Sequence, residues 1–303
     1  MANRNNEDRT GERRAAGANA PPQTISPMIP SSETTGPAGR PLDFTCPTEF
    51  VDIPSKGRFY PKDHPLHNKD SLEIRFMTAK DEDILTSKSL LKKGVAIDRF
   101  LQNIIVDKSI ELSSLIVGDK NAIVVASRIT GYGADYGTKV TCPACGASQD
   151  YSFDLELGKV SEGGTEGLKD NPEMAAAVDS TDNNTWVIDC PKSKAIVEMK
   201  LLTGVDEKHM LKSQAMKKKN KLPEALLTDQ LRQTIVSVNG DSSKLNINRF
   251  IDVMPALDSR YVRSIYEKLM PNVDLTQEFE CHSCGFEQEM EVPFTTDFFW
   301  PKQ

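Results

Sequence analysis

Two short cysteine motifs carry the residues best suited to chemistry in this chain. The first reads Cys142-Pro-Ala-Cys145-Gly and the second reads Cys281-His-Ser-Cys284-Gly. Because two residues separate the thiols of each pair, a tight turn can direct both sulfurs at one metal ion. The glycine that follows can adopt the positive φ that such a turn needs. These motifs, called hooks below, predict a structural Zn²⁺ site with Cys142, Cys145, Cys281 and Cys284 as its ligands.

Sequence typical of β-strands flanks both hooks. Residues 138–141 precede the first hook and residues 151–155 follow it, while residues 286–292 follow the second with mixed polarity. A strand, a cysteine hook and a second strand make up one half-site of a zinc ribbon, so two hooks predict one complete site. Because four thiolates close the tetrahedral shell, such a metal stabilises a fold and leaves no position for a substrate.

Two other interpretations of the cysteines remain open at the level of sequence. A CxxC motif also occurs as a redox pair or a disulfide, although a thioredoxin-like motif should begin a helix and these hooks lie where hairpin turns are expected. The hooks can also hold two separate metals if Cys46 and Cys190, each followed by proline, supply further ligands. One shared site is the prediction that needs the fewest additional ligands.

The bulk composition narrows the class of protein. The 303 residues are enough for about two domains, and the net charge of −7 disfavours broad binding to nucleic acid. No apolar run approaches the roughly 18 residues of a membrane helix, and the N-terminal arginines lack the apolar stretch of a secretory signal. Four of the six cysteines lie in the hooks, which suits a reducing compartment. Sequence motifs of hydrolases, nucleotide-binding folds and metalloproteases are missing, so we expect no enzyme.

The chain is predicted to contain four segments. Residues 1–42 are rich in Gly, Ala, Pro, Ser and Thr and poor in apolar side chains, so we expect a disordered N-terminal arm. Residues 43–156 form a first α+β lobe with one hook, and residues 186–303 form a second lobe with the other hook and an aromatic tail. Between them, the glycines and scattered charges of residues 157–185 predict a flexible linker.

The two lobes show signs of an internal duplication. Each contains a strand, a helix with threonine at its N-cap and aspartate three residues later, two further helices, and a hook. Matching residues recur in the same order: Glu73, Thr78, Asp81 and Glu82 as Glu198, Thr203, Asp206 and Glu207; Leu101 and Ile105 as Leu231 and Ile235; and Asp119 as Asp258. We therefore predict two pseudo-repeated α+β lobes joined by a shared, zinc-ribbon-like four-cysteine site.

Three further features have simpler interpretations. His64 and His67 lie among prolines without a neighbouring thiol, so we expect loop histidines rather than metal ligands. The lysines of 217–221 are expected at a solvated helix end, where they complement the helix dipole, because no aromatic side chains interleave with them as in a nucleic-acid site. The aromatic residues of 294–300 are expected to pack against the chain's own core, with docking into a neighbouring protein as the alternative.

Several stretches resemble T4-type bacteriophage baseplate proteins, in particular the hub and hub-assembly proteins of contractile-tailed phages. They are residues 51–61, residues 77–85, and the second hook with the Phe-Phe-Trp-Pro tail at 298–301. The resemblance implies a structural or chaperone-like assembly protein, made in the host bacterial cytoplasm and then either retained in the virion tail baseplate or active only in its assembly. Its implied partners are other baseplate and hub proteins, with no membrane, nucleic acid or small-molecule substrate. A zinc-ribbon regulator that binds nucleic acid is the alternative, although such ribbons usually keep their hooks close in sequence.

Overall fold

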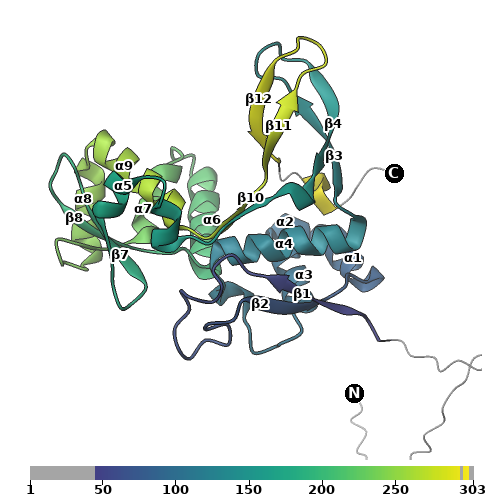
Figure 1. Cartoon of the computed structure of the whole chain (residues 1–303), viewed down its shortest axis with the longest axis horizontal. Coiled ribbons are helices and arrows are strands. Elements are labelled where there is room, and N and C mark those ends of the chain that lie inside the picture. Colours follow the sequence, from purple (N-terminus) through teal and green to yellow (C-terminus); the bar gives the residue numbers. More distant parts are fainter. Residues whose placement is uncertain (1–44, 294–295, 300–303) are drawn as a thin grey trace, which may run out of the picture. The chain divides into compact units, whose positions relative to one another are not determined.

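The structure is a computed structural model in which residues 45–293 and 296–299 are described (Figure 1). The predicted arm, residues 1–42, lies outside the described residues, as do Phe294 and Trp300 of the aromatic tail. The chain from Cys46 onward forms one unit. Its mixed helices and small antiparallel sheets confirm the predicted α+β class.

The first lobe pairs a small antiparallel sheet with a set of helices and ends in a hairpin. Strands β1 and β2 pair with Phe50 opposite Glu73, and the hairpin joins β3 to β4 with Thr141 opposite Ser148. The described elements are β1 (Thr48–Asp52), β2 (Ser71–Arg75), α1 (Ala79–Thr86), α2 (Lys88–Lys93), α3 (Ala96–Ile104), η1 (Leu112–Ser114), α4 (Val117–Tyr132), β3 (Asp135–Thr141) and β4 (Ser148–Asp154).

The stretch 157–185, predicted as a flexible linker, contains several short elements. Strand β5 pairs antiparallel with β10 of the second lobe, so this stretch contributes to a small sheet with a distant part of the chain. The elements are η2 (Leu155–Leu157), β5 (Lys159–Ser161), η3 (Gly164–Leu168), α5 (Pro172–Ala176) and β6 (Val178–Ser180). The domain boundaries and the flexibility of this stretch stay predictions.

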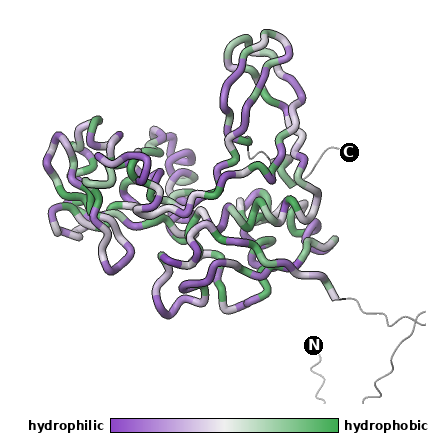
Figure 2. Tube along the Cα trace, viewed as in Figure 1, coloured by the Kyte–Doolittle hydropathy of each residue, from purple (hydrophilic) through white to green (hydrophobic). Residues whose placement is uncertain are grey.

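The second lobe is built on a four-stranded antiparallel sheet in the order β6-β7-β8-β9. Helices α6 and α7 connect β8 to β9, helices α8 and α9 follow the sheet, and a hairpin of β11 and β12 closes the lobe with Glu280 opposite Glu287. The elements are β7 (Thr185–Asp189), β8 (Ile196–Lys200), α6 (Gly204–Lys219), α7 (Leu226–Thr234), β9 (Ile235–Val238), α8 (Lys244–Val253), α9 (Ala256–Leu269), β10 (Asn272–Asp274), β11 (Thr276–Glu280), β12 (Glu287–Glu291) and η4 (Thr296–Phe299). Hydrophobic residues gather in the strands and helices of both lobes (Figure 2). None of the described helices is long and apolar enough to cross a membrane.

The two lobes repeat the same backbone contacts. In the first, Ile74 of β2 forms an antiparallel bridge to Ile105, which directly follows α3. In the second, Met199 of β8 pairs with Ile235, which directly follows α7. These are corresponding residues in the duplication inferred from sequence, and each side chain is buried. The contacts therefore support two pseudo-repeated lobes, because strand, helix and returning strand meet at equivalent positions.

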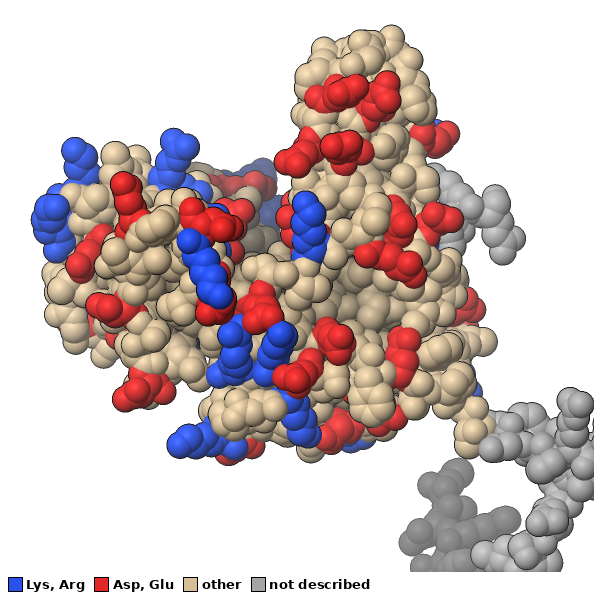
Figure 3. Space-filling model, viewed as in Figure 1, with Lys and Arg blue, Asp and Glu red and all other residues tan. Residues whose placement is uncertain are grey.

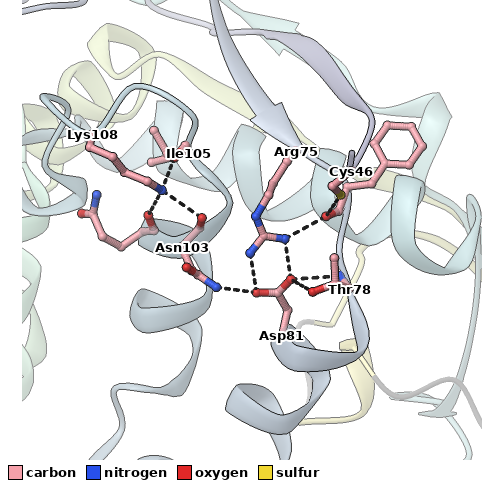
Figure 4. Close-up of polar contacts among 9 residues, drawn as sticks. Cys46, Arg75, Thr78, Asp81, Asn103, Ile105 and Lys108 are labelled. Carbon is pink, nitrogen blue, oxygen red and sulfur yellow. Dashed lines mark hydrogen bonds and ion pairs between the residues drawn. The ribbon is translucent and has the colours of Figure 1, made fainter. Parts of the chain in front are cut away.

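A buried aspartate caps the first helix of each lobe. Asp81 accepts hydrogen bonds from the Thr78 backbone N–H at 2.9 Å and the Thr78 hydroxyl at 2.7 Å, and Arg75 donates to both of its oxygens (Figure 4). Asn103 of α3 adds a further donor at 2.7 Å, so this one carboxylate joins β2, α1 and α3. In the second lobe Asp206 caps α6 in the same way, with Lys200 in the position of Arg75.

The Asp81 contacts predict a dependence of stability on acid. Burial alone raises the pKa of Asp81, but the hydrogen bonds from Arg75, Thr78 and Asn103 outweigh it and lower the pKa from 3.8 to about 2. A depressed folded-state pKa stabilises the fold above the unfolded value, and this stabilisation is lost as the pH falls from about 4 to about 2. We expect Asp81→Asn to lower the free energy of unfolding at pH 7 by about 2 kcal/mol, with a smaller difference at pH 3. Urea titrations of both proteins at each pH measure this; an equal difference at both pH values would contradict it.

Helix α4 packs against the second lobe at a position that only glycine fits. A Cβ added to Gly118 would lie 1.6 Å from the backbone oxygen of Pro271, which precedes β10. Two salt bridges lie close to this contact along α4. The Lys120 amine lies 2.8 Å from Asp98 and 2.6 Å from Glu207 of α6. The contact joins the two lobes far from the hooks.

Gly118→Ala is therefore expected to destabilise the fold although alanine favours helices. The helix propensity gain of about 1 kcal/mol is outweighed by overpacking against rigid backbone, which costs about 1–3 kcal/mol or more. Gly131→Ala is a matched control in the same helix, since its Cβ would meet the flexible tip of Met77 at 2.3 Å. Thermal unfolding should show a lowered melting temperature for Gly118→Ala and little change for Gly131→Ala. Similar melting temperatures for the two variants would contradict the close contact.

Candidate metal centre

Both hooks form tight turns at the tips of hairpins. The Gly146 N–H donates to the Cys142 carbonyl at 2.9 Å, and the Cys142 N–H donates to the Ala147 carbonyl at 2.9 Å. The second hook repeats this arrangement, with Gly285 N–H donating to Cys281 O at 2.8 Å. Gly146 and Gly285 have φ values of 74° and 66°, the left-handed conformation expected from the sequence. The turns therefore hold each pair of thiols on one side of its hairpin.

The two hairpin tips bring the four hook sulfurs together. All four lie within 4.8 Å of one another, with 3.8 Å between the sulfurs of Cys142 and Cys284 and 3.7 Å between those of Cys145 and Cys281. In a tetrahedral site with Zn–S bonds of about 2.3 Å, neighbouring sulfurs lie about 3.8 Å apart. The spacing of these thiols therefore suits a tetrahedral, thiolate-binding metal. Cys142 and Cys281 are buried, while Cys145 and Cys284 are exposed.

Polar contacts between the hairpins align the two hooks independently of the sulfurs. Gln149 of β4 donates its amide to the Glu280 carbonyl at 2.9 Å and accepts from the His282 N–H at 2.9 Å. Further along the same strands, the Tyr151 hydroxyl donates to the Glu278 carbonyl at 2.9 Å. The Tyr151 ring also lies 5.2 Å from that of Phe279. Since β4 and β11 are fixed side by side by these contacts, the ligands are positioned in advance and little ordering remains for metal binding.

The local electrostatics favour a thiolate at one cysteine of the second hook, Cys281. Burial raises the pKa of the Cys281 thiol, but hydrogen bonds from the backbone N–H groups of Ser283 and Cys284 outweigh it, and the pKa falls to about 7. At the other cysteine, the Phe286 N–H lowers the pKa of the Cys284 thiol, but the hydrogen bonds with the neighbouring thiols and burial outweigh it and raise that pKa to about 12. Thiolate is the form that binds a metal. Four thiolates around one divalent ion would fill its coordination shell, so the arrangement can hold a structural metal and offers no open position for a reaction.

The other candidate ligands lie elsewhere. His64 stacks on Tyr60, and its Nε2 lies 2.8 Å from the Ser114 hydroxyl. His67 contacts the Tyr60 carbonyl through Nδ1 at 2.8 Å, so both rings have protein partners in the loop before β2. Cys46 donates its thiol to the Phe76 carbonyl at 3.4 Å. Among the described residues, neither these groups nor Cys190 belong to the four-cysteine cluster.

Sequence reasoning missed a buried arginine that anchors the first hairpin. The Arg128 guanidinium is fully buried and donates to the carbonyls of Gly133 at 2.6 Å, Asp135 at 2.9 Å and Phe298 at 2.7 Å. It therefore ties the end of α4 and the start of β3 to η4 near the C-terminus. Its sequence signal was available, because Arg128 is the one charged residue between Ala122 and Gly131, in the largely apolar second half of α4.

The described part of the aromatic tail packs against the core, as expected. Phe298 lies 5.1 Å from the Tyr136 ring of β3, and Phe299 lies 5.4 Å from the Phe100 ring of α3. Both phenylalanines are buried. The Lys217–Lys219 run also lies where it was predicted, in the last turn of α6.

A protein-family model matches most of the chain. Residues 48–300 match the family described as T4 bacteriophage base plate protein. The chain belongs to this family. The matched region of this base plate protein includes both lobes and both hooks, and it confirms the resemblance seen in the sequence at the level of the family. Proteins of the phage baseplate are structural and typically non-enzymatic. No curated protein and no solved structure matches the chain.

Proposed function

We propose that this base plate protein is a structural or assembly protein of the baseplate hub, with its two lobes held together by one structural Zn²⁺. The observation that carries the proposal is the meeting of two hooks, 136 residues apart, at the sulfur spacing of a tetrahedral site. Cys142, Cys145, Cys281 and Cys284 would be the ligands. Family membership supports the baseplate as the setting.

In this proposal the metal acts on the fold and not on a substrate. When bound, it links the tip of the β3–β4 hairpin to the tip of the β11–β12 hairpin, where Gln149 and Tyr151 already align the strands. The chain's own residues would then present a fixed pair of hairpins and two fixed lobes to neighbouring baseplate proteins. Synthesis in the reducing cytoplasm of the host would keep the thiols available for the metal.

The proposed place in the hub can be tested by following the protein through assembly. Hub intermediates, complete baseplates and virions would be purified from infected cells and their protein content measured by mass spectrometry. We expect the protein in hub intermediates. Its presence in virions as well would identify a structural component, and its loss before the complete baseplate would identify an assembly factor. Detection only in intermediates that lack the hub would contradict the proposal.

The alternative function, a zinc-ribbon regulator, predicts a different result. Such a protein should bind duplex DNA in a salt-sensitive manner, because phosphate contacts release counterions. The proposal predicts no gel shift at moderate salt. A tight shift that disappears when the lysines of residues 217–221 are replaced would favour the regulator instead.

A further inference from the structure

Helix α6 is fully buried only in its first turn, although Met210 packs partly against the core and Lys217 pairs with Asp229 of α7. It runs for 16 residues, yet Gly204 and Asp206 are the residues that it buries. A helix of this length is marginal without tertiary packing. The three turns that follow the capping aspartate therefore depend on few contacts with the rest of the described chain, although they begin within a buried capping box.

Exposed leucines and a methionine surround the far end of this helix. The side chain of Leu211 is 54% exposed, Met216 is 65% exposed and Leu226 is 53% exposed. Leu222 and Leu227 are exposed to a similar degree. Five large apolar side chains are thus exposed within 17 residues of sequence, and two of them, Leu211 and Leu226, line the same pocket. Exposed apolar surface of this kind marks a candidate protein interaction site.

A groove lies between α6 and the start of α7, and we call it the α6–α7 groove. It has a volume of about 370 Å³, and Leu211, Ala215, Ala225 and Leu226 supply its apolar lining. Leu211 and Ala215 stand four residues apart on α6 and so share one face of the helix. The groove thus combines an apolar part with polar residues, Gln214, Lys217, Lys218 and Glu224, as a site for an amphipathic helix requires.

The first lobe shows that this groove is an addition to the shared fold. In the first lobe the helical region begins at the N-cap residue Thr78 and ends at Ile105, the residue after α3. The equivalent stretch, from Thr203 to Ile235, is five residues longer. In the first lobe the helical stretch is interrupted at Ser87 and ends at Gly94, whereas α6 is continuous and ends at the equivalent position, Lys219. The five additional residues therefore lie in the connection to α7, which contributes Glu224 and Ala225 to the groove. Because the first lobe folds with a shorter connection, the fold does not require the groove.

The rim of the groove is positively charged in a protein of net charge −7. Lys217 is held by Asp229 at 2.6 Å, and Glu224 is the acidic residue of the lining. Lys218 also lines the groove, is exposed, and forms no ion pair with any residue of the described chain. Three further exposed lysines without an ion pair to the described residues lie close to it in sequence; they are Lys212, Lys219 and Lys221. This lysine-rich end of α6 complements a ligand that is apolar on one side and acidic along its edges.

We propose that the α6–α7 groove binds an amphipathic helix of another protein, with an apolar stripe that fills the groove and acidic residues that pair with the rim lysines. Nucleic acid fits less well, because the lining offers aliphatic side chains and no aromatic platform for bases. A second copy of this chain also fits less well. Asp and Glu side chains are spread over the visible face of the chain (Figure 3), and the exposed glutamates of the paired hairpins stand on strands and not on a helix; they are Glu278, Glu280, Glu287 and Glu289.

The binding test uses the full-length protein and two synthetic helical peptides. Both have about 16 residues with leucines at helical spacing; one carries glutamates along the edges of the stripe and the other carries lysines at the same positions. Fluorescence anisotropy should show saturable binding of the acidic peptide and binding at least about tenfold weaker for the basic one. The affinity for the acidic peptide should also fall as salt rises, because the rim charges are exposed.

Matched variants locate the binding on the protein. Leu226→Glu and Lys218→Glu should each weaken binding of the acidic peptide by about tenfold. Leu91→Glu and Lys93→Glu alter exposed residues at the end of α2, the equivalent helical position in the first lobe, and should leave it unchanged. All four side chains are exposed, so circular dichroism should show unaltered folding.

Four outcomes would overturn the inference. The first is equal binding of both peptides, or of neither. The second is an equal effect of the groove variants and the α2 variants, since binding would then not depend on this surface. The third is a monomer produced from a dimer by Leu226→Glu in sedimentation experiments, which would make a second copy the occupant. The fourth is displacement of the bound acidic peptide by duplex DNA, which would make a nucleic acid the occupant of the groove.

Discussion

Replacing Cys281 and Cys284 by serine should release the metal from the entire cluster, and replacing Cys142 and Cys145 should do the same. The four sulfurs lie within 4.8 Å of one another, so each pair supplies half of one coordination shell. Two remaining thiols bind zinc far more weakly than four. Native mass spectrometry of protein purified without added metal should therefore find one zinc per chain in the unchanged protein and none in either double variant.

The same variants should also lose stability. Binding of a structural zinc is coupled to folding, and removal of such a site costs on the order of several kcal/mol. Gln149 and Tyr151 retain part of the alignment between the hairpins, so the loss should be smaller than the complete unfolding seen in zinc fingers. Chelation of the unchanged protein should lower its melting temperature by a similar amount, and the double variants should show no further change with the chelator.

Two single variants provide controls for the cluster. Cys46→Ser and Cys190→Ser alter cysteines outside the four-sulfur group, so the zinc content should stay at one per chain. Two zinc ions in the unchanged protein, each retained when the other hook is removed, would show independent sites and contradict the shared centre. Protein without any zinc would leave the hooks as hairpin turns and remove the metal from the proposed function.

Loss of the Asp119 carboxylate should destabilise the first lobe strongly. This buried group accepts from the Ser55 N–H at 2.9 Å, the Ser55 hydroxyl at 2.5 Å and the Tyr60 hydroxyl at 2.7 Å. The Tyr60 oxygen in turn accepts from the Ile116 N–H at 3.0 Å. Burial raises the pKa of Asp119, and the hydrogen bonds from Ser55 and Tyr60 oppose that rise. Asp119→Ala leaves buried donors without an acceptor, so we expect a loss of about 3–5 kcal/mol in urea unfolding.

A smaller change in the same network serves as its control. Tyr60→Phe removes one donor to Asp119 and the acceptor for Ile116, and should cost about 1–3 kcal/mol. Because the two residues share a hydrogen bond, the double variant should be less destabilised than the two single losses combined. Additive losses, or an Asp119→Ala variant as stable as Tyr60→Phe, would show that the carboxylate does not organise this part of the lobe.

The sequence was sufficient for features whose signal is local. The hooks were predicted from four cysteines and two glycines, and their geometry agrees with the expected turns. Thr78 and Asp81 predicted a capping box, because the N-cap and the third helical residue contact one another within a single turn. The recurrence of this pair as Thr203 and Asp206 then indicated the repeat, which the contacts of Ile74 and Met199 support in space.

Features that depend on contacts between residues far apart in the chain could not be predicted from the sequence. Strands β5 and β10 have three residues each and pair across more than 100 positions, so neither has a periodic pattern from which pairing can be inferred. The partners of Arg128 are backbone carbonyls. Every residue has a backbone carbonyl, so the sequence does not indicate which ones bind the guanidinium. The sequence did not predict the α6–α7 groove either. Its lysines were correctly placed at a helix end, but the exposure of Leu211 and Leu226 beside them requires the packed lobe.

The separation of the hooks along the chain also sets an order of events during synthesis. Cys145 and Cys281 are 136 residues apart. At about 5–20 residues per second, a ribosome would make the second hook roughly 7 to 27 s after the first. During that interval the first hairpin has only half of its sulfur cluster, and a chain that terminates early never obtains the rest. Completion of the cluster therefore distinguishes chains that have reached the second hook from chains that terminate before it.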